Sequence, residues 1–205
     1  MKRAFVLVLL CGSPALVAQP LTIVEVAAPA VNKVFSPSGV ISLQDFSSPI
    51  RSTGYLQSRN FDGTAGAPAA GLRVYAYRVD LRKVVGMTHV PSITKLTVNF
   101  GPHVPLDFNG DGKVDDVFVI TRGGIGNIGI ESAIRSGNSI TFTFDPAVAG
   151  GSRSAKGDSS FLFGLCSKFP RKAIDVSATA APPPNVTVPA WAPKYLVLEP
   201  PKAKR

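Results

Sequence analysis

The residues best suited to chemistry lie in one short segment that begins at Asp107 and ends at Asp116. It reads Asp-Phe-Asn-Gly-Asp-Gly-Lys-Val-Asp-Asp, with oxygen-bearing side chains at positions 1, 3, 5 and 9 and a glycine at position 6. This spacing lets a loop wrap around a hard cation, since alternate side chains point inward and position 7 offers its backbone carbonyl. The expected ligands of a structural Ca²⁺ are Asp107, Asn109, Asp111, Lys113 (through its carbonyl oxygen) and Asp115, with Asp116 as a spare or outer group.

The segment resembles the calcium loops of EF-hands, dockerins and FG-GAP-type propellers, which share the pattern Asp-x-[Asp/Asn]-x-Asp-Gly-x-x-Asp. The resemblance covers the loop alone and implies calcium binding rather than a fold. Phe118 stands at position 12, where an EF-hand has a bidentate glutamate, and strand-like segments rather than helices flank the loop. These departures favour a fixed structural ion over a calcium switch. The alternative is a hairpin turn that is acidic without binding an ion.

Other groups able to perform catalysis are few. His89 and His103 are the two histidines, and a histidine beside a proline-rich bend is typically a surface residue. Cys166 lies in an apolar run, which predicts a buried and inert thiol. Gly157-Asp158-Ser159 is similar to the nucleophile block of serine esterases, but those enzymes place their histidine downstream, and both histidines here lie upstream. We therefore expect no enzymatic activity.

A second glycine pattern, Gly124-Ile-Gly-Asn-Ile-Gly129, matches the dinucleotide-binding fingerprint. That motif works only where a long helix begins at its end and receives the pyrophosphate. The sequence leaves room for one helical turn at most, over Glu131 to Arg135. The glycines therefore indicate a bend between strands.

The first 18 residues have the three parts of a secretory signal: basic Met1-Lys2-Arg3, an apolar stretch from Ala4 to Leu10, and a small-residue end. We expect cleavage after Ala18 and a secreted or periplasmic protein. The apolar stretch is too short for a membrane anchor. Lipidation of Cys11 is a weaker alternative, because Leu10 precedes it where a small residue is usual.

Two-residue alternation of apolar and polar side chains recurs along the rest of the chain and is typical of strands with one buried face. The alternating or apolar stretches are 40–46, 72–81, 96–100, 117–120, 140–144 and 174–178. The continuous apolar run 117–120 indicates a central strand. Short strands joined by Gly- and Pro-rich turns, without a convincing helical stripe, predict an all-β fold: an antiparallel β-sandwich of jelly-roll or Ig-like type.

The expected organisation is a signal peptide at 1–18, one β-sandwich domain at 19–181 and a Pro-rich basic tail at 182–205. Three consecutive prolines open the tail, which favours an extended or disordered segment. Trp191, the one tryptophan, either docks on the domain or stacks on a sugar ring. Asn185-Val-Thr is a glycosylation sequon only in a eukaryotic secretory pathway.

Composition excludes a coiled coil, a polytopic membrane protein and a disulfide scaffold. The net charge is +9, and loss of Lys2 and Arg3 with the signal lowers it to +7. No cluster of basic and aromatic residues predicts a nucleic-acid surface. Glycans or envelope components are the expected partners, and no transmembrane segment is expected after signal removal. The sequence predicts no oligomeric state.

The signal, the stretch Leu72–Leu81, the loop leading into Asp116–Thr121 and the stretch Ser159–Leu165 together resemble small exported bacterial β-sandwich proteins of unassigned function. Some of that group carry a C-terminal sorting tail with an apolar span, which is missing here. The leading hypothesis is a secreted, non-enzymatic protein acting in adhesion, envelope or matrix contacts. The alternatives are a carbohydrate-binding module that uses Tyr75, Tyr77 or Trp191, and a hydrolase that uses His103.

Overall fold

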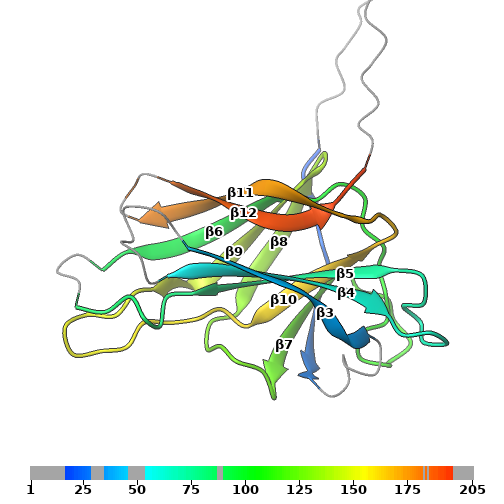
Figure 1. Cartoon of the computed structure of the whole chain (residues 1–205), viewed down its shortest axis with the longest axis horizontal. Coiled ribbons are helices and arrows are strands. Elements are labelled where there is room, and N and C mark those ends of the chain that lie inside the picture. Colours follow the sequence, from blue (N-terminus) through cyan, green and yellow to red (C-terminus); the bar gives the residue numbers. More distant parts are fainter. Residues whose placement is uncertain are drawn as a thin grey trace, which may run out of the picture.

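Alternating side chains do place one face of most strands in a shared interior. The computed structural model describes residues 17–28, 35–45, 54–86, 90–181, 183 and 185–195, and in strand β3 only the backbone is described. These residues form two six-stranded sheets packed face to face, as Figure 1 shows. The all-β sandwich predicted from the sequence is confirmed.

Sheet A has six strands, in the spatial order β1 (Gln19–Pro20), β8 (Ile130–Ser136), β9 (Ser139–Ala149), β6 (Ser92–Asn99), β11 (Arg171–Ala181) and β12 (Val186–Pro193). Sheet B has the order β2 (Ile23–Ala27), β7 (Val117–Arg122), β10 (Leu162–Ser167), β5 (Arg73–Asp80), β4 (Tyr55–Gly63) and β3 (Phe35–Asp45). Neighbouring strands pair antiparallel except β2 and β7, which run parallel. The predicted strand over Val117–Ile120 is indeed internal, between β2 and β10.

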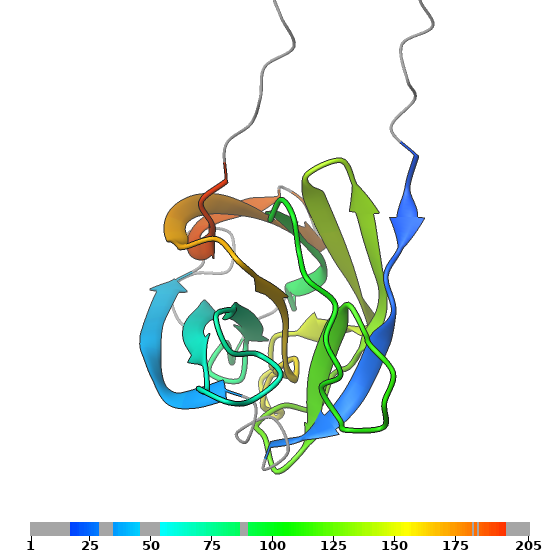
Figure 2. The ribbon, with the colours of Figure 1, turned by 90° about the vertical axis from the view of Figure 1, so that its right-hand side faces the viewer.

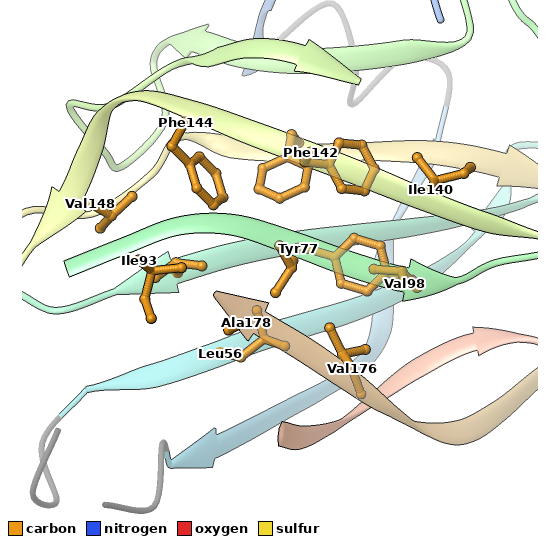
Figure 3. Close-up of a cluster of buried hydrophobic side chains, with 14 of the residues drawn as sticks. Leu56, Tyr77, Ile93, Val98, Ile140, Phe142, Phe144, Val148, Val176 and Ala178 are labelled. Carbon is orange, nitrogen blue, oxygen red and sulfur yellow. The ribbon is translucent and has the colours of Figure 1, made fainter. Parts of the chain in front are cut away.

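The main core lies between the sheets and is rich in aromatic and branched side chains (Figure 3). Phe163 of β10 packs against Phe142 at 4.8 Å and against Phe144 at 5.8 Å between ring centroids. Tyr77 also contacts Phe163. Burial of apolar side chains such as these is the main favourable term in the folding free energy.

A second apolar cluster covers the opposite face of sheet B, so β5 and β7 are buried on both sides. Phe118 of β7 packs above Gly164 of β10, where a Cβ would lie 3.0 Å from the ring and 2.3 Å from the carbonyl oxygen of Tyr75. Gly164 therefore leaves the space that the ring occupies.

The expectation that the chain leaves the domain at residue 182 is wrong for Val186–Pro193. These residues form β12, paired with β11 along eight positions. Their apolar positions alternate toward the core, and Pro189 is tolerated because β12 is an edge strand, where a missing N–H breaks no ladder. Residues 196–205, Pro182 and Pro184 lie outside the described part of the chain.

β12 is also bonded across the sandwich to sheet B. Trp191 donates its backbone N–H to Ser58 Oγ at 2.9 Å and accepts a bond from the hydroxyl of Tyr77 at 2.7 Å. Its indole packs partly against the main core. Of the two sequence interpretations of Trp191, docking on the domain is the one confirmed.

The segment 124–135 consists of a bend followed by most of strand β8. The prediction of a single helical turn over Glu131 to Arg135 is wrong, because this stretch is part of strand β8. The glycines from Gly124 to Gly129 do form the bend between β7 and β8, as predicted, and no helix follows them. No helix in the described chain is long and apolar enough to cross a membrane.

A buried carboxylate at the end of β5 is held by charged neighbours. Asp80 is 2% exposed and accepts bonds from Arg82 at 2.5 to 3.1 Å and from the hydroxyl of Tyr55 at 2.8 Å. Burial alone would raise the pKa of Asp80, but the bonds from Arg82 and Tyr55 outweigh it and lower the pKa below its ordinary value.

The lowered pKa predicts a specific pH dependence for Asp80→Asn. The ionised carboxylate stabilises the fold fully above its ordinary pKa, and that contribution is lost as pH falls through the lower folded value. We expect the variant to lose on the order of 2 kcal/mol at neutral pH, between an exposed pair and a fully buried one. Urea unfolding at a series of pH values should show this deficit shrink in acid. Asp62→Asn, in an exposed pair with Arg73, is the control, and an equal deficit at all pH values would refute the assignment.

Candidate metal centre

The predicted ion loop belongs to a longer segment, residues 100–116, which joins β6 to β7 and crosses the outer face of sheet B. Backbone bonds fix it at three points: Gly101 N–H to the carbonyl of Asn138 at 2.8 Å, Val104 to Cys166 at 2.9 Å, and a two-bond bridge between Leu106 and Asp115. Figure 2 shows the green loop against the blue N-terminal strand. The loop 107–116 is thus closed at its base by backbone pairing.

Apolar side chains on the same segment cover the second core. Phe108 is fully buried, and its ring centroid lies 5.1 Å from that of Phe118. Val104 and Leu106 join the cluster beside Cys166. Position 2 of the loop is therefore an anchor, which fixes the polar positions 1 and 3 on either side of it.

Asp107 organises the loop through its carboxylate. Oδ1 accepts the backbone N–H groups of Gly110 at 2.6 Å and Asp111 at 3.2 Å, and Oδ2 accepts that of Gly112 at 2.9 Å. Gly110 and Gly112 have φ of 80° and 84°, a left-handed conformation that glycine adopts without strain. The turn therefore depends on both its acid and its glycines.

Asn109 and Asp111 continue the same pattern on the exposed side. Asn109 Oδ1 accepts the N–H of Asp111 at 3.1 Å, its Nδ2 donates to Asp111 Oδ2 at 3.0 Å, and Asp111 Oδ1 accepts the N–H of Lys113 at 2.8 Å. The bonds from Asn109 and Lys113 lower the pKa of Asp111. The structure thus connects Asp107, Asn109, Asp111 and the backbone of Lys113 in one hydrogen-bonded turn.

Asp115 has the opposite electrostatic setting. Its pKa is raised, first by partial burial and then by the negative charges of Asp111, Asp116 and Asp107. The fifth predicted ligand therefore faces the other acids of the loop and is repelled by them. A cation placed among these groups would remove that repulsion.

The carboxylates nevertheless stand apart. Among the described residues, no three acidic, histidine or cysteine side chains gather closely enough to hold a metal ion by themselves. Two of the five predicted ligands, the Asn109 amide and the Lys113 carbonyl, belong to other chemical classes. The donors are the hard oxygens that Ca²⁺ prefers, so the donor chemistry fits the ion although the carboxylates alone do not form a site.

Asp116, expected as a spare group, is instead a structural clamp. Its Oδ2 accepts the backbone N–H and the hydroxyl of Thr22 at 2.8 and 3.0 Å, and its own N–H donates to Thr22 Oγ1 at 2.9 Å. Its Oδ1 lies 2.7 Å from His103 Nε2. These bonds tie the loop to the N-terminal segment, where the chain passes from sheet A to sheet B.

His103 is largely buried, so its interpretation as a surface residue is wrong. Arg135 Nη1 lies 2.9 Å from its Nδ1, and because a guanidinium can only donate, Nδ1 accepts and Nε2–H donates to Asp116. Both ring nitrogens are therefore engaged by described residues. Nothing in the sequence signals these long-range partners, Thr22 and Arg135.

The remaining candidate residues are mostly inaccessible. Cys166 is buried as predicted, and burial strongly raises the pKa of its thiol. Ser159 is buried and donates to the carbonyl of Val79. Tyr75 and Tyr77 are fully buried and donate to backbone carbonyls, so their interpretation as sugar-stacking platforms is wrong. His89 lies outside the described residues.

Comparison with known proteins adds no assignment. No protein-family model, curated protein or solved structure matches this chain.

The clamp predicts a measurable loss in Thr22→Val. The variant keeps the backbone bond to Asp116 but loses the two bonds of the hydroxyl, so we expect a loss of about 1 to 2 kcal/mol in the free energy of unfolding. Thr121→Val is the matched control, since its hydroxyl makes one long bond to Glu25 at an exposed site. Urea unfolding of both variants is the measurement, and equal stabilities would show that the clamp contributes nothing.

Proposed function

We propose that this chain is an exported, non-enzymatic β-sandwich protein that holds a structural Ca²⁺ in loop 107–116. It acts through its surface in envelope, adhesion or matrix contacts. The observation that carries the proposal is the loop itself: a Asp-x-Asn-x-Asp-Gly-x-x-Asp segment, closed at its base and anchored by Phe108. Asp107, Asn109, Asp111, Lys113 and Asp115 supply the oxygens.

Charge and accessibility support a cation at this place. Asn109 and Asp111 are exposed, so an ion reaches them without disturbing the core. The neighbouring acids that raise the pKa of Asp115 favour any arrangement that brings a positive charge among them. Ca²⁺ accepts irregular coordination by six to eight oxygens, whereas Mg²⁺ demands a tighter octahedral set. A turn that mixes carboxylate, amide and carbonyl donors suits Ca²⁺ better.

The position of the first strand supports export. β1 begins at Gln19, directly after the cleavage point predicted at Ala18, and pairs with β8. The predicted cleavage would therefore leave both residues of β1, Gln19 and Pro20, in the chain to pair with β8. A single buried thiol leaves the described domain without an internal disulfide, so a bound ion is one way to stabilise its loops outside the cell.

Calcium should raise the melting temperature of the protein. For a weak extracellular site, with a dissociation constant of about 1 mM, roughly 10 mM Ca²⁺ stabilises by about 1.4 kcal/mol, or about 3 to 6 °C. Asp111→Asn should abolish this shift, because it replaces one of the carboxylate ligands with a neutral amide. The calcium-induced shift, rather than the stability in EDTA, is the quantity to compare, since the carboxylate of Asp111 also accepts bonds from Asn109 and Lys113 without an ion. Asp175→Asn, at an exposed acid of β11, is the control. An equal calcium shift in Asp111→Asn and in the original chain would refute the site.

A second candidate, carbohydrate binding, is favoured by the solvent-facing side of sheet A. Thr141, Thr97, Ser177 and Thr187 lie in register on four neighbouring strands and form one row of hydroxyls. The first two bond to each other at 3.0 Å. A row of uncharged hydroxyls suits a neutral polysaccharide, which presents hydroxyls along its own length.

A glycan array run with and without calcium tests this candidate. If the row binds sugar, Thr97→Glu should lose the signal because it places a charge in the middle of the row. Thr121→Glu, at a half-buried position of β7 in sheet B, should keep it. Absence of any glycan signal, or a signal that survives in Thr97→Glu, would exclude the row as the binding surface.

A further inference from the structure

Positive charge exceeds negative charge in one part of the outer face of sheet B, where three arginines lie near one acid. Arg59 of β4 and Arg78 of β5 stand on this face, and Arg82 follows at the end of β5. The acid that the described structure places beside them is Asp80. The carboxylate of Asp80 pairs most closely with Arg82, whose Nη2 lies 2.5 Å from Oδ2. Nη2 of Arg78 lies farther from the same oxygen, at 3.5 Å.

The two strand arginines keep unsatisfied donors. The Nε atoms of Arg59 and Arg78 are both buried and have no hydrogen-bond partner among the described residues. The side chain of Arg78 is 7% exposed, and its one hydrogen bond to a described residue is a long one, 3.3 Å, to the hydroxyl of Tyr55. A buried guanidinium N–H without an acceptor costs stability, so the pair is incomplete as it stands.

Strand register places the two side chains in adjacent rows of the same face. Arg59 lies opposite Ala76, and Arg78 lies opposite Gln57. Partial burial, and then the positive charge of Arg78, lower the pKa of Arg59, as expected when two cations lie close together. The guanidinium of Arg59 also rests over the ring of Phe61, 4.9 Å from its centroid, and no ion pair with a described residue engages it.

We propose that Arg59 and Arg78 form a binding site for an oxyanion, a carboxylate or a phosphate group. Two planar guanidinium forks suit the two oxygens of such a group, and their charge is not balanced locally. Arg59 is half-buried and gives access from solvent, while Arg78 is the deeper anchor. This site is independent of the proposed calcium loop.

An acid of the chain itself is the competing partner. Strand β3 carries Asp45 opposite Tyr55, and Tyr55 in turn lies opposite Asp80. By register, Asp45 is two rows away from Arg59, whose partner on β3 is Ile41. That placement favours an external anion for Arg59, and an Asp45 variant tests it.

Anion binding is measured by calorimetry and thermal melting at constant ionic strength and neutral pH. The probes are inorganic phosphate, glucuronate and polygalacturonate, which separate a free anion from an acidic sugar and from its polymer. We expect at least one probe to raise the melting temperature. Arg59→Gln should weaken that probe by about tenfold or more, as loss of a charged hydrogen bond does, and Arg59→Lys should weaken it less. Arg73→Gln, on β5 but paired with Asp62, should bind as the original chain does.

Three results would overturn the proposal. The first is that no probe raises the melting temperature of the protein. The second is that a probe binds Arg59→Gln as tightly as it binds the original chain. The third is a phosphate response that is absent in the original chain and appears in Asp45→Asn, which would assign the partner of the arginines to Asp45. Because Arg59 is half-buried, its variants are expected to fold, and an unchanged circular dichroism spectrum checks this.

Discussion

Burial of sheet B on both faces is the constraint on which the rest of the structure depends. The main core takes one face, so the chain must supply a second layer for β5 and β7. Much of that layer is the segment 100–116, which has no regular secondary structure of its own beyond isolated bridges. Ordering such a segment costs conformational entropy at each residue, and it has few ladder hydrogen bonds to offset that cost. Hydrogen bonds must therefore hold the segment in place, and the carboxylates of Asp107 and Asp116 accept several of them.

The ties and the apolar anchor act on neighbouring residues of the same loop. Phe108 is buried between Asp107 and Asn109, and Asp116, which clamps Thr22, is adjacent to Asp115. An ion that fixed Asp107, Asp111 and Asp115 relative to one another would therefore also fix the cover of the second core and the entry of the N-terminal strand. The same face of sheet B carries excess negative charge in the loop and excess positive charge at Arg59 and Arg78. The cation and the anion that we propose would each neutralise one of these excesses.

Local sequence patterns predicted correctly those strands and turns that depend on residues close together in the chain. Alternation over 140–144 and the apolar run 117–120 located strands correctly, because side-chain period reports burial directly. The hydrogen-bonded turn of the loop follows from Asp107 and its glycines. Proline concealed β12, since the same residue type opens extended tails and is accepted in edge strands. Thr22 and Asp116 are 94 residues apart, and the engagement of His103 by Arg135 depends on the packing of β8 beside the loop, so no local pattern could reveal either.

Amide hydrogen exchange in the loop, measured by NMR in calcium and in EDTA, tests most directly whether an ion stabilises the cover of sheet B. The relevant amides are those of Gly110, Gly112 and Lys113, which already donate to loop carboxylates. With Ca²⁺ at about ten times its dissociation constant, these amides should exchange roughly tenfold more slowly than in EDTA. The exchange rate of the Phe142 amide, in the core-facing part of sheet A, serves as the reference for global stability. Equal loop rates in calcium and EDTA would contradict a structural ion in this loop.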